Sequence, residues 1–334
     1  MLLKNAILSN INVDIMTNLD KSILKTLIFF DIFDYPLTAI EIWKWLYRPG
    51  EKYRLSQVKH ALSGSQDLSD KIETAEGFYS LKGRIHNFFR SKHNNNLAER
   101  KFSKAVRLAK FYRFIPFVRM MAVVNSLAYS NAKENSDIDF FIITAKNKIW
   151  LARFFTIFFV RIFGLRHKQE SNRDAFCMSF FVEEDYLNIK NVMLHNKDIY
   201  MPYWVQQMMP IYDPDGLYGK FLQANSWFRD YLPNSYGNQF SKEVKANFWS
   251  RLSGAVFKFL SSPPIINKWS DNVYRQVQSR IIDNNLKSLV NVDTRVIINE
   301  KMLKFHANDR REMFYRKWRE KISKIIKPKA GAAA

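Results

Sequence analysis

One short stretch constrains the fold of this chain more than any other, because it places two acids on one face of an apolar strand. Residues 121–124 (Met-Ala-Val-Val) suit a buried strand, and Asn125-Ser126 follows as a turn. After a short helical start and a polar loop, residues 137–143 (Asp-Ile-Asp-Phe-Phe-Ile-Ile) predict a second strand. Side chains at i and i+2 of a strand project from the same face, so Asp137 and Asp139 are expected to converge.

A converging carboxylate pair suits divalent cations. Mg²⁺ prefers a few carboxylates together with phosphate oxygens, and phosphoryl transfer commonly uses two metal ions about 4 Å apart. An isolated Asp-x-Asp occurs by chance in many chains, and a solvated loop can mimic it. The prediction therefore depends on the whole order: apolar strand, turn with Ser126, a step of eleven residues to Asp137, and the acid-bearing strand.

This order resembles the active-site segment of the DNA polymerase β superfamily of nucleotidyltransferases. The resemblance implies transfer of an NMP from an NTP to an acceptor hydroxyl, with Asp137 and Asp139 holding Mg²⁺ or Mn²⁺. It also implies that Asn125 and Ser126 bind the nucleotide, through main-chain N–H groups and the Ser hydroxyl. The family has Gly where this chain has Asn125. Asn is the best substitute where φ is positive, but its side chain takes space that phosphates need. A catalytically weakened, nucleic-acid-binding or assembly subunit is the alternative function.

The family takes a third carboxylate from a later, neighbouring strand. Asp174 stands at the start of the predicted strand 175–182, so the resemblance implies that it completes the catalytic and metal-binding set. At that place it would also activate the attacking hydroxyl. Glu183, Glu184 and Asp185 at the other end of the strand are competitors, although acids there also suit the first turn of a following helix.

The rest of the chain predicts a helix-rich α+β protein. Helices within 20–62 and a β-hairpin within 71–81 follow the order of a winged helix, and Thr38 to Glu41 has the pattern of a capping box. The predicted parts are a winged-helix-like module (1–84), a basic helical connector (85–118), a small mixed-sheet nucleotidyltransferase core (119–190) and a helical C-terminal region with a basic tail (191–330). This organisation resembles bacterial proteins described only as nucleotidyltransferase-domain proteins, with specific motifs around 122–144 alone.

The formal net charge of +21 favours polyanionic partners such as RNA or DNA, although a Lys-rich coding bias explains part of it. Cations and aromatic residues interleave near the C-terminus, where cations neutralise phosphates and aromatics stack on bases. The candidate nucleic-acid-binding residues there are Arg310, Arg311, Arg316, Lys317 and Arg319. The same stretch also suits an amphipathic helix whose apolar face is docked while its basic face is free.

Residues 149–165 are very apolar but contain Arg153 and Arg161. The stretch is shorter than the roughly 20 apolar residues of a membrane span, so a buried helix and no membrane insertion are predicted. The single Cys177 excludes an intramolecular disulfide and a Cys-based zinc site, which favours a reducing, cytoplasmic location. The first residues lack the pattern of a signal peptide. His195 and His306 are expected to be structural.

Overall fold

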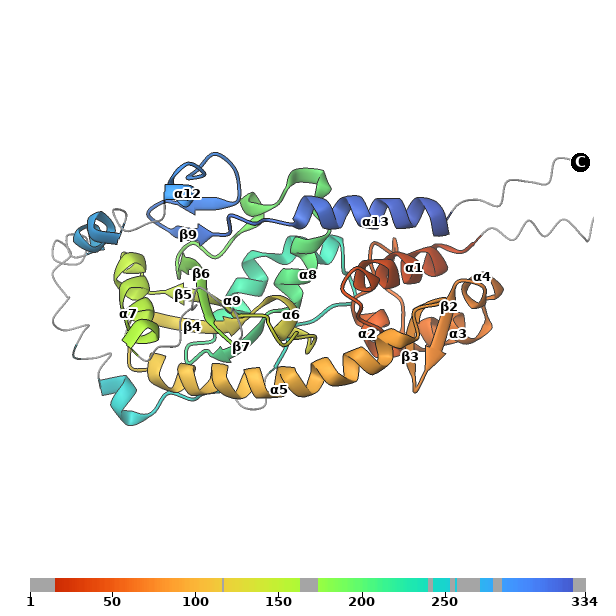
Figure 1. The fold of residues 1–334 in the computed structure, drawn as a ribbon, viewed down its shortest axis with the longest axis horizontal. Coiled ribbons are helices and arrows are strands. Elements are labelled where there is room, and N and C mark those ends of the chain that lie inside the picture. Colours follow the sequence, from red (N-terminus) through yellow and green to blue (C-terminus); the bar gives the residue numbers. More distant parts are fainter. Residues whose placement is uncertain are drawn as a thin grey trace, which may run out of the picture. The chain divides into compact units, whose positions relative to one another are not determined.

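The computed structural model describes residues 16–115, 117–162, 174–239, 243–252, 256, 271–278 and 284–326. The chain is a mixed α+β protein, as the sequence predicts (Figure 1). It divides into two compact units. Of the described residues, unit 1 holds those up to Phe89, Tyr231–Ser235 and those from Arg316 onward. Unit 2 holds Arg90–Asp230 and Tyr236–Tyr315.

Unit 1 combines short helices with a three-stranded antiparallel sheet in the order β1-β3-β2. Its elements are α1 (Asn18–Asp31), β1 (Leu37–Thr38), α2 (Ala39–Lys44), α3 (Leu55–Gly64), α4 (Gln66–Ser69), β2 (Ile72–Ala75) and β3 (Phe78–Leu81). The predicted capping box opens α2: Glu41 N–H donates to Thr38 Oγ1, and Thr38 N–H donates to the Glu41 carboxylate. The periodicity does not predict β1, because two residues are too few to show a pattern.

The part of α13 (Arg311–Ile325) from Arg316 onward belongs to unit 1. Trp318 is buried there; its indole N–H donates to the Lys25 carbonyl at 3.0 Å, and its ring lies 5.3 Å from that of Tyr47. Lys321 pairs with the buried Asp31. One face of this segment is therefore docked, while the cations listed next are exposed: Arg316, Lys317, Arg319 and Lys324.

Unit 2 is built on a six-stranded mixed sheet in the order β7-β4-β5-β6-β9-β8. The strands are β4 (Val118–Val123), β5 (Ile138–Thr144), β6 (Phe176–Glu183), β7 (Met209–Tyr212), β8 (Val296–Ile298) and β9 (Met302–Phe305). Neighbouring strands are antiparallel except β5 and β6, which are parallel. A parallel pair needs a crossover connection, and the chain between β5 and β6 contains α7 (Ile149–Ile162).

Helices of unit 2, including α5 from Arg90 onward, cover the sheet with apolar side chains. They are α5 (His86–Tyr112), α6 (Asn125–Ala128), α7, α8 (Tyr200–Gln207), α9 (Leu217–Ala224) and α12 (Asn284–Lys287), with short 3-10 turns at Lys190–Val192, His195–Lys197 and Ser226–Asp230. Tyr112 of α5, Trp150 of α7 and Phe181 of β6 are fully buried in one apolar cluster. Ile138, the first residue of β5, belongs to the same cluster, so the core fixes the position of the start of β5.

The region predicted to be helical, 191–330, supplies three of the six strands. This part of the prediction is wrong, because β7, β8 and β9 have three or four residues each and show no usable alternation. The edge strand β7 also contains Pro210, which disfavours a strand by sequence alone.

The apolar stretch at 149–165 forms α7 from Ile149, as predicted; residues 163–165 lie outside the described residues. Among the helices that the structure describes, none has the length and apolar character needed to cross a membrane.

Candidate metal centre and adjoining pocket

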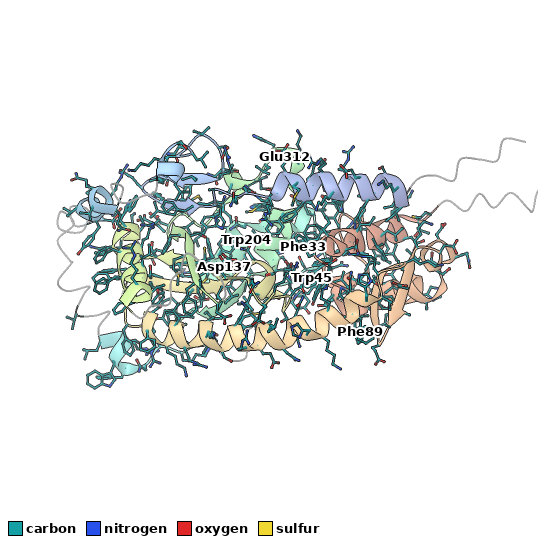
Figure 2. All side chains as sticks on the ribbon, in the orientation of Figure 1. Phe33, Trp45, Phe89, Asp137, Trp204 and Glu312 are labelled. Atoms are coloured by element: carbon teal, nitrogen blue, oxygen red, sulfur yellow. The ribbon has the colours of Figure 1, made fainter. Side chains whose placement is uncertain are left out.

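Asp137 and Asp139 lie at the start of β5, and the sheet brings Cys177 to them (Figure 2 marks Asp137). The parallel register pairs Asp139 with Cys177 of β6. One potential ligand atom from each of Asp137, Asp139 and Cys177 lies within 4.8 Å of the others. The predicted convergence of the two acids is therefore present, with a thiol as the third member of the group.

Burial and the neighbouring Asp137 charge raise the pKa of Asp139 to about 6. Hydrogen bonds donated by the Asn125 amide and the Cys177 thiol oppose this rise. A cation between the two carboxylates would relieve their repulsion, and two carboxylates form a hard donor set that suits Mg²⁺ or Mn²⁺. Burial and the Asp139 charge raise the pKa of the Cys177 thiol well above its usual value, so the thiol serves as a hydrogen-bond donor to Asp139.

Asn125 has a φ of 59°, so the turn adopts the left-handed backbone that the sequence predicts for it. Its amide Nδ2 donates to Asp139 Oδ2 at 2.8 Å. Its Oδ1 accepts from Tyr200 Oη and Trp204 Nε1, both at 3.0 Å. The Asn125 side chain is thus fixed by three hydrogen bonds, one to Asp139 and two from aromatic side chains of α8. Ser126 is partly exposed, and its hydroxyl makes no hydrogen bond within the described residues.

The Asp174 carboxylate pairs with two lysines of α5 and is not part of the group formed by Asp137, Asp139 and Cys177. Its carboxylate lies 2.9 Å from Lys101 Nζ and 2.6 Å from Lys104 Nζ. Although burial alone would raise its pKa, hydrogen bonds from Lys104 and Lys101 hold the pKa of Asp174 below its usual value. Its φ of 58° places it in a turn before β6. The structure therefore does not group Asp174 with Asp137 and Asp139.

Cys177 is absent from the site residues that the sequence predicts, although the strand pattern contains a signal for it. Residues of equal parity share a face of a strand, and parallel pairing of 137–143 with 175–182 places residue 177 beside Asp139. The acid at 174 has the opposite parity. Because the expected third ligand is an acid, the thiol at position 177 is not predicted as part of the site.

The acids at the far end of β6 serve other partners. Glu183 is buried at the end of the strand. Glu184 pairs with Arg119 at 3.3 Å, and Asp185 pairs with Lys146 and Lys301 at 3.2 and 3.1 Å. They do not cap a following helix as expected, because the next helical turn begins only at Lys190.

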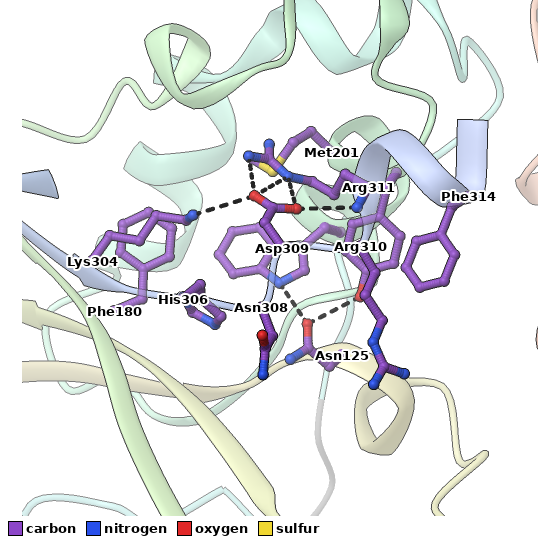
Figure 3. A pocket seen from close by; sticks show the side chains of 12 residues that line it. Asn125, Phe180, Met201, Lys304, His306, Asn308, Asp309, Arg310, Arg311 and Phe314 are labelled. Atoms are coloured by element: carbon purple, nitrogen blue, oxygen red, sulfur yellow. Dashed lines mark hydrogen bonds and ion pairs between the residues drawn. The ribbon is translucent and has the colours of Figure 1, made fainter. Parts of the chain in front are cut away.

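A cavity of about 180 Å³ adjoins the acid pair through Asn125, which forms part of its wall (Figure 3). Phe180, Tyr200, Trp204 and Phe314 give the cavity an aromatic lining. Polar side chains from the segment after β9, including His306 and Arg310, complete it. Asn125 is thus shared between the carboxylates and the cavity.

Arg311 lines this cavity, but its guanidinium donates only to groups of the protein itself within the described residues. It is 5% exposed, and its guanidinium donates to Asp309, Asp198, the Val192 carbonyl and Thr294. All five of its N–H donors are thereby used. This removes Arg311 from the predicted nucleic-acid-binding residues, whereas Arg310, Arg316, Lys317 and Arg319 have exposed side chains.

No protein-family model, curated protein or solved structure matches this chain. Chemically, the arrangement offers two carboxylates for a hard cation, a serine hydroxyl in the preceding turn, and an aromatic cavity next to them.

Proposed function

We propose that unit 2 is a nucleotidyltransferase of the DNA polymerase β type, which transfers an NMP from an NTP to an acceptor hydroxyl. The observation that carries the proposal is the convergence of Asp137 and Asp139 next to the Asn125-Ser126 turn. Two features of the fold support it: β4, the short helix α6 that begins at Asn125, and β5 follow one another along the chain, and β6 lies parallel to β5.

Asp137 and Asp139 would hold Mg²⁺ or Mn²⁺, since their donor set suits either ion. The bound metal would neutralise phosphate charge and align the attacking and leaving oxygens. The Ser126 hydroxyl would donate to a phosphate oxygen. The Asn125 amide orients the Asp139 carboxylate through its hydrogen bond to Oδ2.

The second candidate is a catalytically weakened protein of the same fold that binds nucleic acid. It is favoured by the thiol that stands beside Asp139 while Asp174 is neutralised by two lysines. It is also favoured by the Asn125 side chain, which occupies space near the pair. The topology of unit 1, with sheet order β1-β3-β2, supports a winged helix whose α3 exposes Gln57, Lys59 and His60.

Label transfer separates the two candidates. The full chain is incubated with each NTP labelled at the α-phosphate, Mg²⁺ or Mn²⁺, and a pool of RNA, DNA, protein and small-molecule acceptors. Metal-dependent transfer is expected, and Asp137→Asn combined with Asp139→Asn should abolish it. Asp215→Asn combined with Asp230→Asn is the matched control, because it removes two exposed carboxylates of unit 2 outside the site.

Absence of transfer with every acceptor would reject the enzyme proposal. Salt-sensitive nucleic-acid binding that persists in the Asp137→Asn, Asp139→Asn variant would then favour the second candidate.

A further inference from the structure

An exposed aromatic surface lies at the C-terminal end of α5, within unit 2. A short helix begins there at Phe248, after Asn247. The Asn247 Oδ1 accepts from Ser250 N–H, and Ser250 Oγ accepts from Asn247 N–H, both at 2.9 Å. The first two helical residues, Phe248 and Trp249, are 70% and 65% exposed. Leu252 is also exposed, one turn after Phe248 and on the same side. Neighbouring apolar side chains that are exposed together mark an interaction surface.

The end of α5 extends this surface. Phe111 and Phe114 are exposed as well. They follow Arg107 by four and seven residues, a spacing that places all three on one side of α5 and of the turn after it. The two segments are in contact, because Arg113 Nη1 donates to the Lys245 carbonyl at 3.4 Å. Figure 1 shows the short helix beside this end of α5.

The charge of the two segments is strongly positive. Residues 107–115 and 243–252 contain five cations and one acid. The acid, Glu243, pairs with Lys245 at 3.0 Å. The exposed cations around the aromatic side chains are Arg107, Lys110, Lys245 and Arg251. An apolar surface with cations around it fits a partner that offers both apolar contacts and negative charge.

Lipid bilayers and single-stranded nucleic acids are the two common partners with that chemistry. Nucleic-acid bases stack on flat rings, a contact that the aliphatic Leu252 cannot make. In the interfacial region of a bilayer, Trp, Phe and Leu side chains contact the acyl chains, while Lys and Arg attract anionic headgroups. The combination of aromatic, aliphatic and basic side chains therefore favours a bilayer.

We propose that this surface of unit 2 docks on an anionic lipid bilayer. Phe248 and Trp249 insert between the headgroups, and the four exposed cations bind the anionic lipids. The contact is peripheral, because a short surface helix lies in the interface and does not cross it. This role goes beyond the proposed transfer reaction and does not depend on it.

Co-sedimentation of the full chain with vesicles tests the proposal. The vesicles contain phosphatidylcholine and phosphatidylglycerol in equal parts, and vesicles of phosphatidylcholine alone are the comparison. Binding to the anionic vesicles is expected, and it should weaken as salt is added. Phe248→Gln combined with Trp249→Gln should weaken it by about tenfold. Lys110→Gln combined with Arg251→Gln should weaken it by about ten- to thirtyfold.

Matched controls remove similar side chains from other places. Phe89→Gln combined with Val292→Gln removes two exposed apolar side chains outside this surface. Lys190→Gln combined with Lys220→Gln removes two exposed cations. Both control variants should bind the anionic vesicles within about twofold of wild type. Circular dichroism and thermal melting confirm that every variant is folded.

Fluorescence places the contact at Trp249. Lipids brominated along the acyl chains quench a tryptophan that inserts among them, so wild type should be quenched on binding. Trp249→Phe keeps an apolar ring, and it should bind nearly as well while much of the quenching is lost. Quenching that is unchanged in Trp249→Phe would place the lipid contact elsewhere and overturn the proposal.

Other results would also overturn it. Absence of binding to the anionic vesicles would do so, as would equal losses in the test and control variants. If Phe248→Gln combined with Trp249→Gln weakens binding of a single-stranded oligonucleotide and vesicles are not bound, the partner is nucleic acid. If this variant changes only the sedimentation coefficient, the partner is a second copy of the chain.

Failure of this inference is distinguishable from failure of the transferase proposal. Asp137→Asn combined with Asp139→Asn leaves the docking surface intact, so this variant should bind anionic vesicles like wild type. Vesicle binding without label transfer would support the docking surface alone. Label transfer by a chain that binds no vesicles would leave the transferase proposal standing and reject the docking surface.

Discussion

At the scale of the residue, Asn125 combines a backbone constraint with three hydrogen bonds. Its φ of 59° is a conformation that Gly adopts without steric cost and that Asn tolerates. Its amide gives Tyr200, Trp204 and Asp139 a partner each. A substitution at Asn125 therefore has two opposing effects on the free energy of unfolding. Relief of the left-handed backbone raises it, and loss of the three hydrogen bonds lowers it.

Asn125→Gly is expected to lower the free energy of unfolding by about 1–2 kcal/mol. Two partly buried donors lose their acceptor, at about 1–3 kcal/mol, while relief of the left-handed backbone returns up to about 1 kcal/mol. Metal-dependent nucleotide binding should strengthen several-fold, because the amide no longer occupies the space or the Asp139 oxygen. Urea unfolding and equilibrium nucleotide binding measure the two effects.

Asn147→Gly is the control for the backbone alone, since Asn147 also has a positive φ, 55°, and is exposed. It should be neutral or slightly stabilising. Weaker nucleotide binding in Asn125→Gly would contradict the steric role given to the Asn side chain.

Glu183 predicts a pH dependence of stability. It is 1% exposed, and burial followed by the Asp185 charge raises its pKa from 4.5 to about 7. Between these values the folded state binds more protons than the unfolded state, so the free energy of unfolding falls as pH rises through this window. Glu183→Gln should remove this decrease, which is at most about 3 kcal/mol, and raise stability at pH 8.

The comparison that decides this prediction is chemical denaturation of wild type and Glu183→Gln at pH 5 and pH 8. A difference that is the same at both pH values would refute the raised pKa of Glu183. Asp230→Asn removes an exposed carboxylate and serves as the control.

The site residues that could be predicted from the sequence are those whose positions follow from a pattern within one short segment. Asp137, Asp139 and the turn at Asn125 follow from alternation and turn preference within one short segment. The bonds from Tyr200 and Trp204 come from 75 and 79 residues away, which no local pattern specifies. Cys177 depends on the register of β6 against β5, and a one-residue change of register exchanges the two faces.

At the scale of the element, α5 holds the loop that precedes β5. Lys101 is fully buried, and its Nζ donates to the carbonyls of Glu134 and Ser136 and pairs with Asp174. Ser136 directly precedes Asp137, so the helix fixes the approach to the acid pair. The long basic helix was predictable from its own sequence, whereas this use of a lysine was not, because a cation suggests an exposed position.

Lys101→Met is expected to destabilise the chain by about 2–3 kcal/mol, because the carbonyls of Glu134 and Ser136 lose a buried donor while Asp174 keeps its pair with Lys104. Lys104→Met should cost less than about 1 kcal/mol, since the Lys104 side chain is 37% exposed although it also pairs with Asp174. Urea unfolding of the two variants gives the comparison. Equal losses would show that burial of Lys101 has no special weight.

Elements of the sheet were predictable in proportion to their length. β5 and β6 have seven and eight residues and were expected from their apolar patterns. β8 has three residues and pairs with β9, which itself joins the sheet beside β6. Pairing with a distant partner stabilises such strands, so their own sequences carry little signal.

At the scale of the whole molecule, the net charge of +21 is the excess of Lys and Arg over Asp and Glu, and burial determines which of the cations can reach a partner. Lys101, Lys304 and Arg311 are buried and paired with acids or carbonyls. The cations of α13 that belong to unit 1 are exposed, whereas Trp318 is buried on the docked face. A charge count therefore overstates the basic surface of unit 2 near the pocket.

Arg316→Gln, Lys317→Gln and Arg319→Gln together are expected to weaken single-stranded nucleic-acid binding and to reduce its salt dependence. Each phosphate contact contributes roughly 0.7 to the slope of log K against log salt, so losing three contacts should make the slope shallower by about 2. Gln retains helix propensity, so α13 should stay folded.

Lys190→Gln, Lys197→Gln and Lys220→Gln remove the same charge from exposed positions elsewhere and serve as the control. Fluorescence anisotropy over a salt series measures both slopes. An equal change in the two triple variants would mean that net charge alone drives binding and that α13 offers no specific surface.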